Sequence, residues 1–159
     1  MAKKVKIKKT LVEQILSKAG IPHQGIQINA LEGELPQGYE RDQIFKTLAL
    51  LGDKTGPIIG IVPITQHLSE KKLAKISGNK KVSMIPQKDL EKTTGYIHGA
   101  NNPVGIRQKH NYPIFIDKIA LDLDQMFVSA GEVGHSIIVA PQELASFVKA
   151  DFADILEDK

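Results

Sequence analysis

The residue whose setting most strongly suggests chemistry is Lys46, inside the otherwise apolar stretch Phe45–Leu51, which has the composition of a buried strand. A fully buried ammonium is costly unless it is paired or used. A lysine here, followed by Thr47, therefore predicts a pocket wall that holds an anion. The alternative is a lysine at a strand edge, whose ammonium reaches water along its methylene stem.

A second candidate is the run Gly99-Ala100-Asn101-Asn102-Pro103, which lies within the glycine-rich stretch 95–105. A glycine and a proline that bracket small polar residues can fix a loop whose backbone amides and carbonyls point at a ligand. Such a loop can position an ester and a water molecule without a side-chain base. The same spacing also occurs in ordinary turns.

The sequence gives little support to serine-nucleophile or metal chemistry. No Gly-x-Ser-x-Gly elbow is present, and Ser129 and the pair His135-Ser136 are the nearest nucleophile candidates. Ser129 is also explained as a polar residue where a strand enters a hairpin. The five histidines show no metal-ligand spacing, and the absence of cysteine excludes disulfides and thiolate metal sites. We therefore expect no metal site.

The composition fits one globular domain. The chain has 159 residues, of which 42% are apolar and 25% charged, enough for a substantial core. No run of 18 apolar residues and no signal-peptide pattern is present, which disfavours membrane spanning and secretion. Together with the lack of cysteine, this fits a cytoplasmic protein.

Basic residues are concentrated at two places. Five lysines fall within residues 1–9, and Arg107, Lys109 and His110 form a second cluster. Both suit a polyanionic partner such as RNA, although a basic terminal run is more often a solvated tail than a dedicated RNA contact. We expect segment 1–9 to precede a single domain that spans residues 10–159.

The elements that must position these residues follow from capping, turn and periodicity signals. In chain order we expect a helix over 11–19 with a capping box from Thr10 to Glu13, a strand marked by Ile26, Ile28 and Ala30, a loop with Gly33, Pro36 and Gly38, a hairpin of 45–51 and 57–62, a helix from Ser69 to Gly78, a strand over 82–85, a helix over 87–92, a loop over 95–105, strands over 113–117, 126–129 and 136–139, and a helix from Pro141 whose packing Phe152 and Ile155 extend. Short helices alternating with hairpins predict an α+β domain, with a curved, mostly antiparallel mixed sheet flanked by helices.

The segments 45–48, 94–105, 113–117 and 127–131 resemble, in order and spacing, the YbaK/EbsC family. These proteins are related to the editing domain of bacterial prolyl-tRNA synthetase, and the resemblance runs from Thr10 to Ile155. It implies an α+β editing-domain fold and a free-standing deacylase that hydrolyses the ester of mischarged aminoacyl-tRNA. The implied substrate is Cys-tRNA(Pro), or Ala-tRNA(Pro) as in close relatives, with prolyl-tRNA synthetase as a possible partner.

The resemblance also implies roles for individual residues. Lys46 would hold the terminal phosphate or ribose of the tRNA, and Gly99 would begin the loop that orients the aminoacyl group. The expected substrate-binding residues are Thr47, Ala100, Asn101, Asn102, Pro103, Ser129 and Gly131. No metal or cofactor is implied, because the thiol of a cysteinyl substrate is thought to attack the ester.

Two positions depart from the family pattern. Family members carry a tyrosine in the first strand and an aspartate after the last hairpin, where this chain has Ile28 and Ser136. The loop before Lys46 is also shorter and lacks a helix. These departures leave open which amino acid is removed. They also leave open a binding module that has lost its activity, or a general RNA-binding protein.

Overall fold

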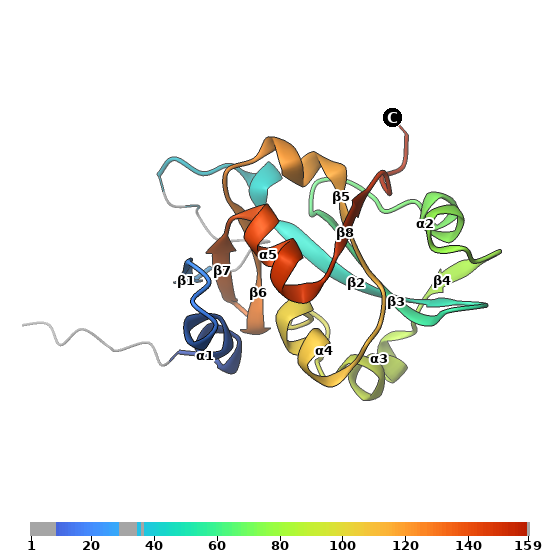
Figure 1. The fold of residues 1–159 in the computed structure, drawn as a ribbon, viewed down its shortest axis with the longest axis horizontal. Coiled ribbons are helices and arrows are strands. Elements are labelled where there is room, and N and C mark those ends of the chain that lie inside the picture. Colours follow the sequence, from blue (N-terminus) through green and yellow to red (C-terminus); the bar gives the residue numbers. More distant parts are fainter. Residues whose placement is uncertain (1–8, 29–34, 36, 159) are drawn as a thin grey trace, which may run out of the picture.

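The computed structural model describes residues 9–28, 35 and 37–158 (Figure 1). The predictions for segment 1–8, Ala30, Gly33 and Pro36 lie outside the described residues. The elements are α1 (Leu11–Lys18), β1 (His23–Gln27), η1 (Arg41–Gln43), β2 (Phe45–Gly52), β3 (Gly56–Pro63), α2 (Glu70–Ser77), β4 (Val82–Met84), α3 (Gln87–Thr94), α4 (Pro103–Lys109), β5 (Ile114–Asp117), η2 (Lys118–Asp122), β6 (Met126–Glu132), β7 (His135–Val139), α5 (Pro141–Val148) and β8 (Asp151–Ala153).

The strands form two sheets. One has the order β1-β7-β6 and is antiparallel throughout, and the other has the order β4-β2-β3-β5-β8 with parallel pairs at β3–β5 and β5–β8. A parallel bridge between Ile44 and Phe127 links them. The predicted α+β class with mostly antiparallel pairing is confirmed, but the strands divide into two sheets where one curved sheet was expected.

The main core lies where the helices α1, α4 and α5 pack against both sheets. It contains Leu16, Ile61, Ile106, Val128 and Leu144. A second cluster packs α2 and the C-terminal segment on the other face of the five-stranded sheet. In Figure 1, α1 lies beside the small sheet at one end of the molecule, and α2 and β4 lie at the opposite end.

The first helix begins as predicted, but its capping box is only half formed. The Glu13 amide donates to Thr10 Oγ1 at 3.2 Å. The Glu13 carboxylate does not return to the cap. Its Oε1 lies 2.6 Å from His135 Nε2, and both side chains are buried. A local motif is thus replaced by a contact across 122 residues of sequence, which no sequence pattern signals.

Three other predicted segments are confirmed. The β2–β3 hairpin pairs Phe45 with Pro63 and Gly52 with Gly56. Ser69 caps α2 by accepting a hydrogen bond from the Lys72 amide at 3.1 Å, and Gly78 ends the helix with φ +80°. The predicted strand at 82–85 is β4.

The predicted loop over 95–105 is wrong at its C-terminal end, because α4 begins at Pro103. Asn102 caps α4 by accepting a hydrogen bond from the Gly105 amide at 2.6 Å. Proline is well suited to the first turn of a helix, where its missing N–H costs nothing. The Asn-Pro pair was therefore a helix-start signal that the glycine content concealed.

The C-terminal part adds a short strand that the sequence did not predict. Phe152 lies in β8 and packs on the main core, as expected, while Ile155 packs into the second cluster beneath α2. Among the described residues, no helix is both long enough and apolar enough to cross a membrane.

Candidate functional site

Lys46 and Ser129 lie on one face where the two sheets meet. Side chains alternate along extended backbone, so Lys46 of β2 lies on the same side as Ile44, the extended residue just before β2, and Ser129 shares a face of β6 with Phe127. Ile44 and Phe127 form the parallel bridge and pack in one apolar cluster with Ile138. The bridge therefore places Lys46 and Ser129 on neighbouring strands, on the side of that cluster.

Ser129 links this face to residues 99–103, which we call the Gly99 loop. Its Oγ lies 3.4 Å from the Gly99 carbonyl oxygen and accepts a hydrogen bond from the Gly131 amide at 3.2 Å. A register shift between Ser129 and Glu132 marks a β-bulge at this point. Bulges re-aim side chains and occur often beside active sites. Gly131 has φ +93°, a conformation that favours glycine.

Gly99 is the part of the loop that is presented to solvent. It is exposed, and its φ is +89°. Its amide forms no hydrogen bond with any residue that the structure describes. An exposed amide next to a carbonyl directed at Ser129 can donate to a ligand oxygen without rearrangement. The backbone of Gly99 is therefore available to a ligand, and its role in orienting one stays a prediction.

The polar side chains of the loop are used inside it. The Thr94 hydroxyl donates to Asn101 Oδ1 at 2.7 Å. Asn102 is fully buried; besides capping α4, its Nδ2 donates to the Ala100 carbonyl at 3.1 Å. Ala100 is buried, and Pro103 opens α4. These contacts hold the backbone that carries Gly99, and the predicted role of these four residues in binding the substrate stays a prediction.

Thr47 points away from Lys46. As the next residue of β2 it lies on the opposite face, with Phe45 and Ala49 of the main core. Its Oγ1 is buried and has no hydrogen-bond partner among the described residues. The structure does not bring the Thr47 side chain to the face that carries Lys46 and Ser129.

Lys46 is half-buried, which fits the alternative of a lysine whose ammonium reaches water along its stem. At this point β2 pairs only with β3, because β4 pairs with β2 over Leu50–Gly52. Its side chain lines an open groove of about 770 Å³, together with Leu48, His67, Leu68, Ser69, Glu70, Lys71, Met84 and Glu157. The ammonium makes no ion pair within the described part of the chain. It is therefore available to an anion that enters from solvent.

The two positions that depart from the family pattern flank this face. Ser136 is buried and pairs with Ser129 in β6 and with Ile26 in β1. Ile28 is also buried, and its amide donates to the Gly134 carbonyl at 2.9 Å. The segment just before Lys46 contains only the short turn η1.

The basic cluster at 107–110 is engaged within the fold. Arg107 Nε donates to the Val148 carbonyl at 2.6 Å, and burial lowers the pKa of its guanidinium. Lys109 Nζ lies 5.3 Å from the centre of the Tyr96 ring, and His110 stacks on Tyr112 at 4.5 Å. These contacts anchor α4, so they weaken the prediction of an RNA-binding cluster here.

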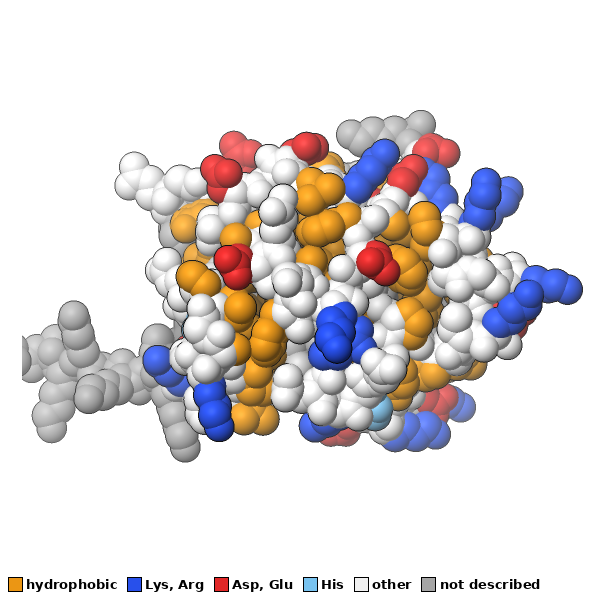
Figure 2. All heavy atoms as spheres, in the orientation of Figure 1, with side chains coloured by type: hydrophobic (Ala, Val, Ile, Leu, Met, Phe, Trp, Pro, Cys, Tyr) orange, Lys and Arg blue, Asp and Glu red, His pale blue; other side chains and the backbone are white. Residues whose placement is uncertain are grey.

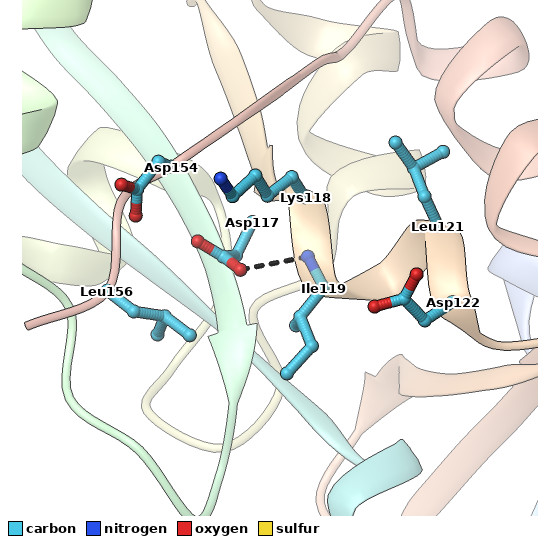
Figure 3. A pocket seen from close by; sticks show the side chains of 7 residues that line it. All are labelled: Asp117, Lys118, Ile119, Leu121, Asp122, Asp154 and Leu156. Carbon is cyan, nitrogen blue, oxygen red and sulfur yellow. Dashed lines mark hydrogen bonds between the residues drawn. The ribbon is translucent and has the colours of Figure 1, made fainter. Parts of the chain in front are cut away.

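A separate hollow lies beside η2 and the C-terminal segment (Figure 3). Its most buried acid is Asp117, which accepts hydrogen bonds from the amides of Ile119 and Ile155, both at 2.9 Å. Asp117 thus has a structural role. In the described part of the chain, no three His, Asp or Glu side chains come together as metal ligands do.

Comparisons with known proteins identify the family of this chain. Residues 33–147 match the family described as aminoacyl-tRNA editing domain. The chain is 38% identical, over 98% of both chains, to an Enterococcus faecalis protein provisionally named Cys-tRNA(Pro)/Cys-tRNA(Cys) deacylase EbsC. A solved scaffold protein used for computational epitope grafting superposes with a TM-score of 0.79 at 25% identity, covering 93% of this chain and 96% of that one. A provisionally assigned trans-editing enzyme for prolyl-tRNA synthetase gives 0.75 at 22%, covering 92% and 95%.

The family match and the full-length relative thus define an enzyme of aminoacyl-tRNA editing. The chain belongs to the aminoacyl-tRNA editing domain family, whose members hydrolyse mischarged aminoacyl-tRNA.

Proposed function

We propose that this protein hydrolyses Cys-tRNA(Pro) in trans, in the cytoplasm, and thereby removes cysteine that was attached to the wrong tRNA. The observation that carries the proposal is the shared face of Lys46, Ser129 and Gly99: an unpaired ammonium lies beside a strand whose serine contacts an exposed backbone loop. The full-length similarity to the Enterococcus protein supports cysteine as the substrate amino acid.

In this proposal Lys46 holds the 3′ end of the tRNA. The terminal nucleotide carries phosphate oxygens and ribose hydroxyls, and a flexible ammonium with three donors can contact either. The half-buried stem of Lys46 restricts where its charge can lie, which lowers the entropy lost on binding. The free groove beside it admits the nucleotide from solvent.

The Gly99 loop orients the ester. When the carbonyl carbon is attacked, negative charge develops on its oxygen, and the free Gly99 amide is placed to donate a hydrogen bond there. Ser129 connects the Gly99 carbonyl to the Gly131 amide, which fixes the direction of the loop. Preorganised donors of this kind stabilise the transition state more than the ground state.

The attacking group is proposed to be the thiol of the substrate cysteine. Its sulfur bonds to the carbonyl carbon as the bond to the ribose oxygen breaks, and the thiol proton passes to that oxygen. Water then opens the cyclic thioester to free cysteine. This route needs no nucleophile or metal from the protein. It is compatible with a neutral Ser136 where relatives carry an acid, because no protein base is required.

A second candidate is a binding module that retains the pocket without turnover. It is favoured by Ile28 and Ser136, which are buried beside the site and differ from the family pattern. Such a module would bind aminoacyl-tRNA and release amino acid no faster than buffer. Editing of Ala-tRNA(Pro) is a narrower variant of the main proposal, since the departures lie near the amino-acid side chain.

The test is a panel of labelled tRNA(Pro) charged with cysteine, alanine, serine or proline, each incubated with the purified protein and followed for ester loss. Serine is the matched control, because it replaces only the sulfur. We expect rapid loss of cysteine alone. Equal loss of cysteine and serine would contradict thiol attack, and loss of alanine alone would reassign the substrate. No loss of any ester would contradict deacylation and leave the binding module.

A further inference from the structure

A group of exposed lysines lies at the end of the molecule farthest from α1. Lys54 sits in the turn between β2 and β3, and Lys80 and Lys81 sit in the loop between α2 and β4; all three are exposed. We call these three residues the basic tip. Figure 2 shows Lys and Arg side chains gathered at this end, where Figure 1 places α2, β4 and the β2–β3 turn.

The backbone beneath the basic tip is braced. Asn79 is buried, and its Oδ1 accepts hydrogen bonds from the amides of Lys54 at 2.8 Å and Thr55 at 3.0 Å. In the other direction, Asp53 Oδ1 accepts from the amides of Lys80 at 2.9 Å and Lys81 at 3.0 Å. Two loops far apart in sequence therefore hold each other, and the lysines project from a fixed platform.

Asp53, the acidic residue next to the basic tip, is held by the amides of Lys80 and Lys81. The amide of Lys81, followed by that of Lys80, lowers the pKa of the Asp53 carboxyl, because both stabilise its charged form. The ammonium groups of Lys54, Lys80 and Lys81 form no ion pair with any described residue. Lys72 in α2 differs, since it is bound to Asp154 at 3.2 Å and Asp158 at 2.8 Å.

The tip is connected to the Lys46 groove by β2 and β4. Gly52, where the turn begins, lies six residues from Lys46 along β2, which corresponds to about 20 Å at the rise of a strand. Met84 of β4 and Lys71 of α2 line the groove, so the elements that flank the loop of Lys80 and Lys81 also border the groove. A short single-stranded end held at Lys46 would bring the helical stem that follows it to the tip.

We propose that the basic tip binds the phosphate backbone of the tRNA acceptor stem while the 3′ end occupies the Lys46 face. This inference rests on the proposed function for its ligand. Unpaired lysines on a fixed platform suit a regular array of phosphates, and such contacts fix register without reading sequence. The tip would thus supply affinity for any acceptor stem, and the site near Gly99 would supply amino-acid selectivity.

The test compares two triple variants of the full chain. The tip variant reverses the charge of the basic tip and is Lys54→Glu/Lys80→Glu/Lys81→Glu. The control variant makes the same charge change at exposed lysines elsewhere and is Lys18→Glu/Lys118→Glu/Lys149→Glu. Binding of uncharged tRNA is measured by fluorescence anisotropy at several salt concentrations. Ester loss is measured with Cys-tRNA and with a minimal substrate, cysteinyl-adenosine. Thermal melts establish that each variant is folded.

We expect the tip variant to lose roughly tenfold to hundredfold in tRNA affinity and to show a shallower salt dependence, with unchanged turnover of cysteinyl-adenosine. The control variant should lose much less. Equal losses in both variants would overturn the proposal, because net charge would then explain them. Unchanged tRNA affinity in the tip variant would also overturn it and point to an acidic protein partner.

The readouts separate this proposal from the proposed function. Binding of uncharged tRNA does not require hydrolysis. A protein that cleaves no ester, but whose tip variant loses tRNA affinity selectively, would retain the tip as an RNA-binding surface while the deacylase proposal fails.

Discussion

The Gly99 loop and the basic tip are built in the same way but present different chemistry. Each is fixed by buried asparagines, Asn101 and Asn102 in the loop and Asn79 in the tip. The loop exposes a neutral backbone at Gly99, whereas the tip exposes three ammonium groups. In both regions the buried asparagines determine the shape of the backbone, and the exposed groups determine which ligand can bind. In the loop the exposed group is a backbone amide, which no side-chain motif reveals.

Among the changes to these two regions, Asn102→Ala should have the largest effect on stability and activity. The change removes the cap of α4 and leaves the Gly105 amide and Ala100 carbonyl without their buried partner. We expect a loss of about 2–3 kcal/mol in unfolding free energy, which is a fall in Tm of about 5–10 °C at this chain length. Deacylation of both tRNA and minimal substrates should fall. An unchanged melting curve would show that Asn102 does not hold the loop.

Asn79→Ala should lower stability less than Asn102→Ala does, and it should weaken the binding of tRNA without affecting the minimal substrate. The amides of Lys54 and Thr55 lose their acceptor, but both residues are exposed and water can replace it. We expect a loss of about 1 kcal/mol in stability and a roughly threefold loss of tRNA affinity, measured by chemical denaturation and anisotropy. Turnover of cysteinyl-adenosine should stay constant. A matching fall in that turnover would show that the tip and the loop are not independent.

The smallest effect is the pH response of the tip. The folded pKa of Asp53 is lowered by the amides of Lys81 and Lys80, so its charged form stabilises the tip above the ordinary aspartate pKa of about 3.9. This contribution is lost as the pH falls through the lowered value. NMR shifts of the two lysine amides should therefore titrate below about pH 4, and stay flat in Asp53→Asn. A midpoint at or above the ordinary value would contradict the bracing.

The ends of helices and the turns of hairpins could be predicted from the sequence, because each is marked by residues next to it in the chain. Ser69 and Gly78 mark the ends of α2, and the turn between β2 and β3 is marked by its flanking apolar strands. The start of α4 was missed, although Asn102 and Pro103 are a helix-start signal. The strand β8 is only three residues long and owes its pairing to β5, so nothing local marks it.

The site could be predicted only in part. Residue type and setting singled out Lys46 and Gly99 as candidates, but their position relative to each other depends on the bridge between Ile44 and Phe127, which is a contact across 83 residues. The face on which Thr47 lies follows from strand alternation once β2 is placed. The pairing of Glu13 with His135 is a long-range contact, and it replaced a plausible local motif.

The ammonium of Lys46, which forms no ion pair with any described residue, is proposed to hold the substrate. Steady-state deacylation of Cys-tRNA(Pro) by the Lys46→Ala and Lys46→Arg variants tests this role. Lys46→Arg is the matched control, because it keeps the charge on a long stem. With thermal melts unchanged, we expect Lys46→Ala to lose at least about a hundredfold in kcat/KM, and Lys46→Arg to lose less. A folded Lys46→Ala protein that turns over Cys-tRNA(Pro) at the wild-type rate would show that the Lys46 ammonium does not hold the substrate.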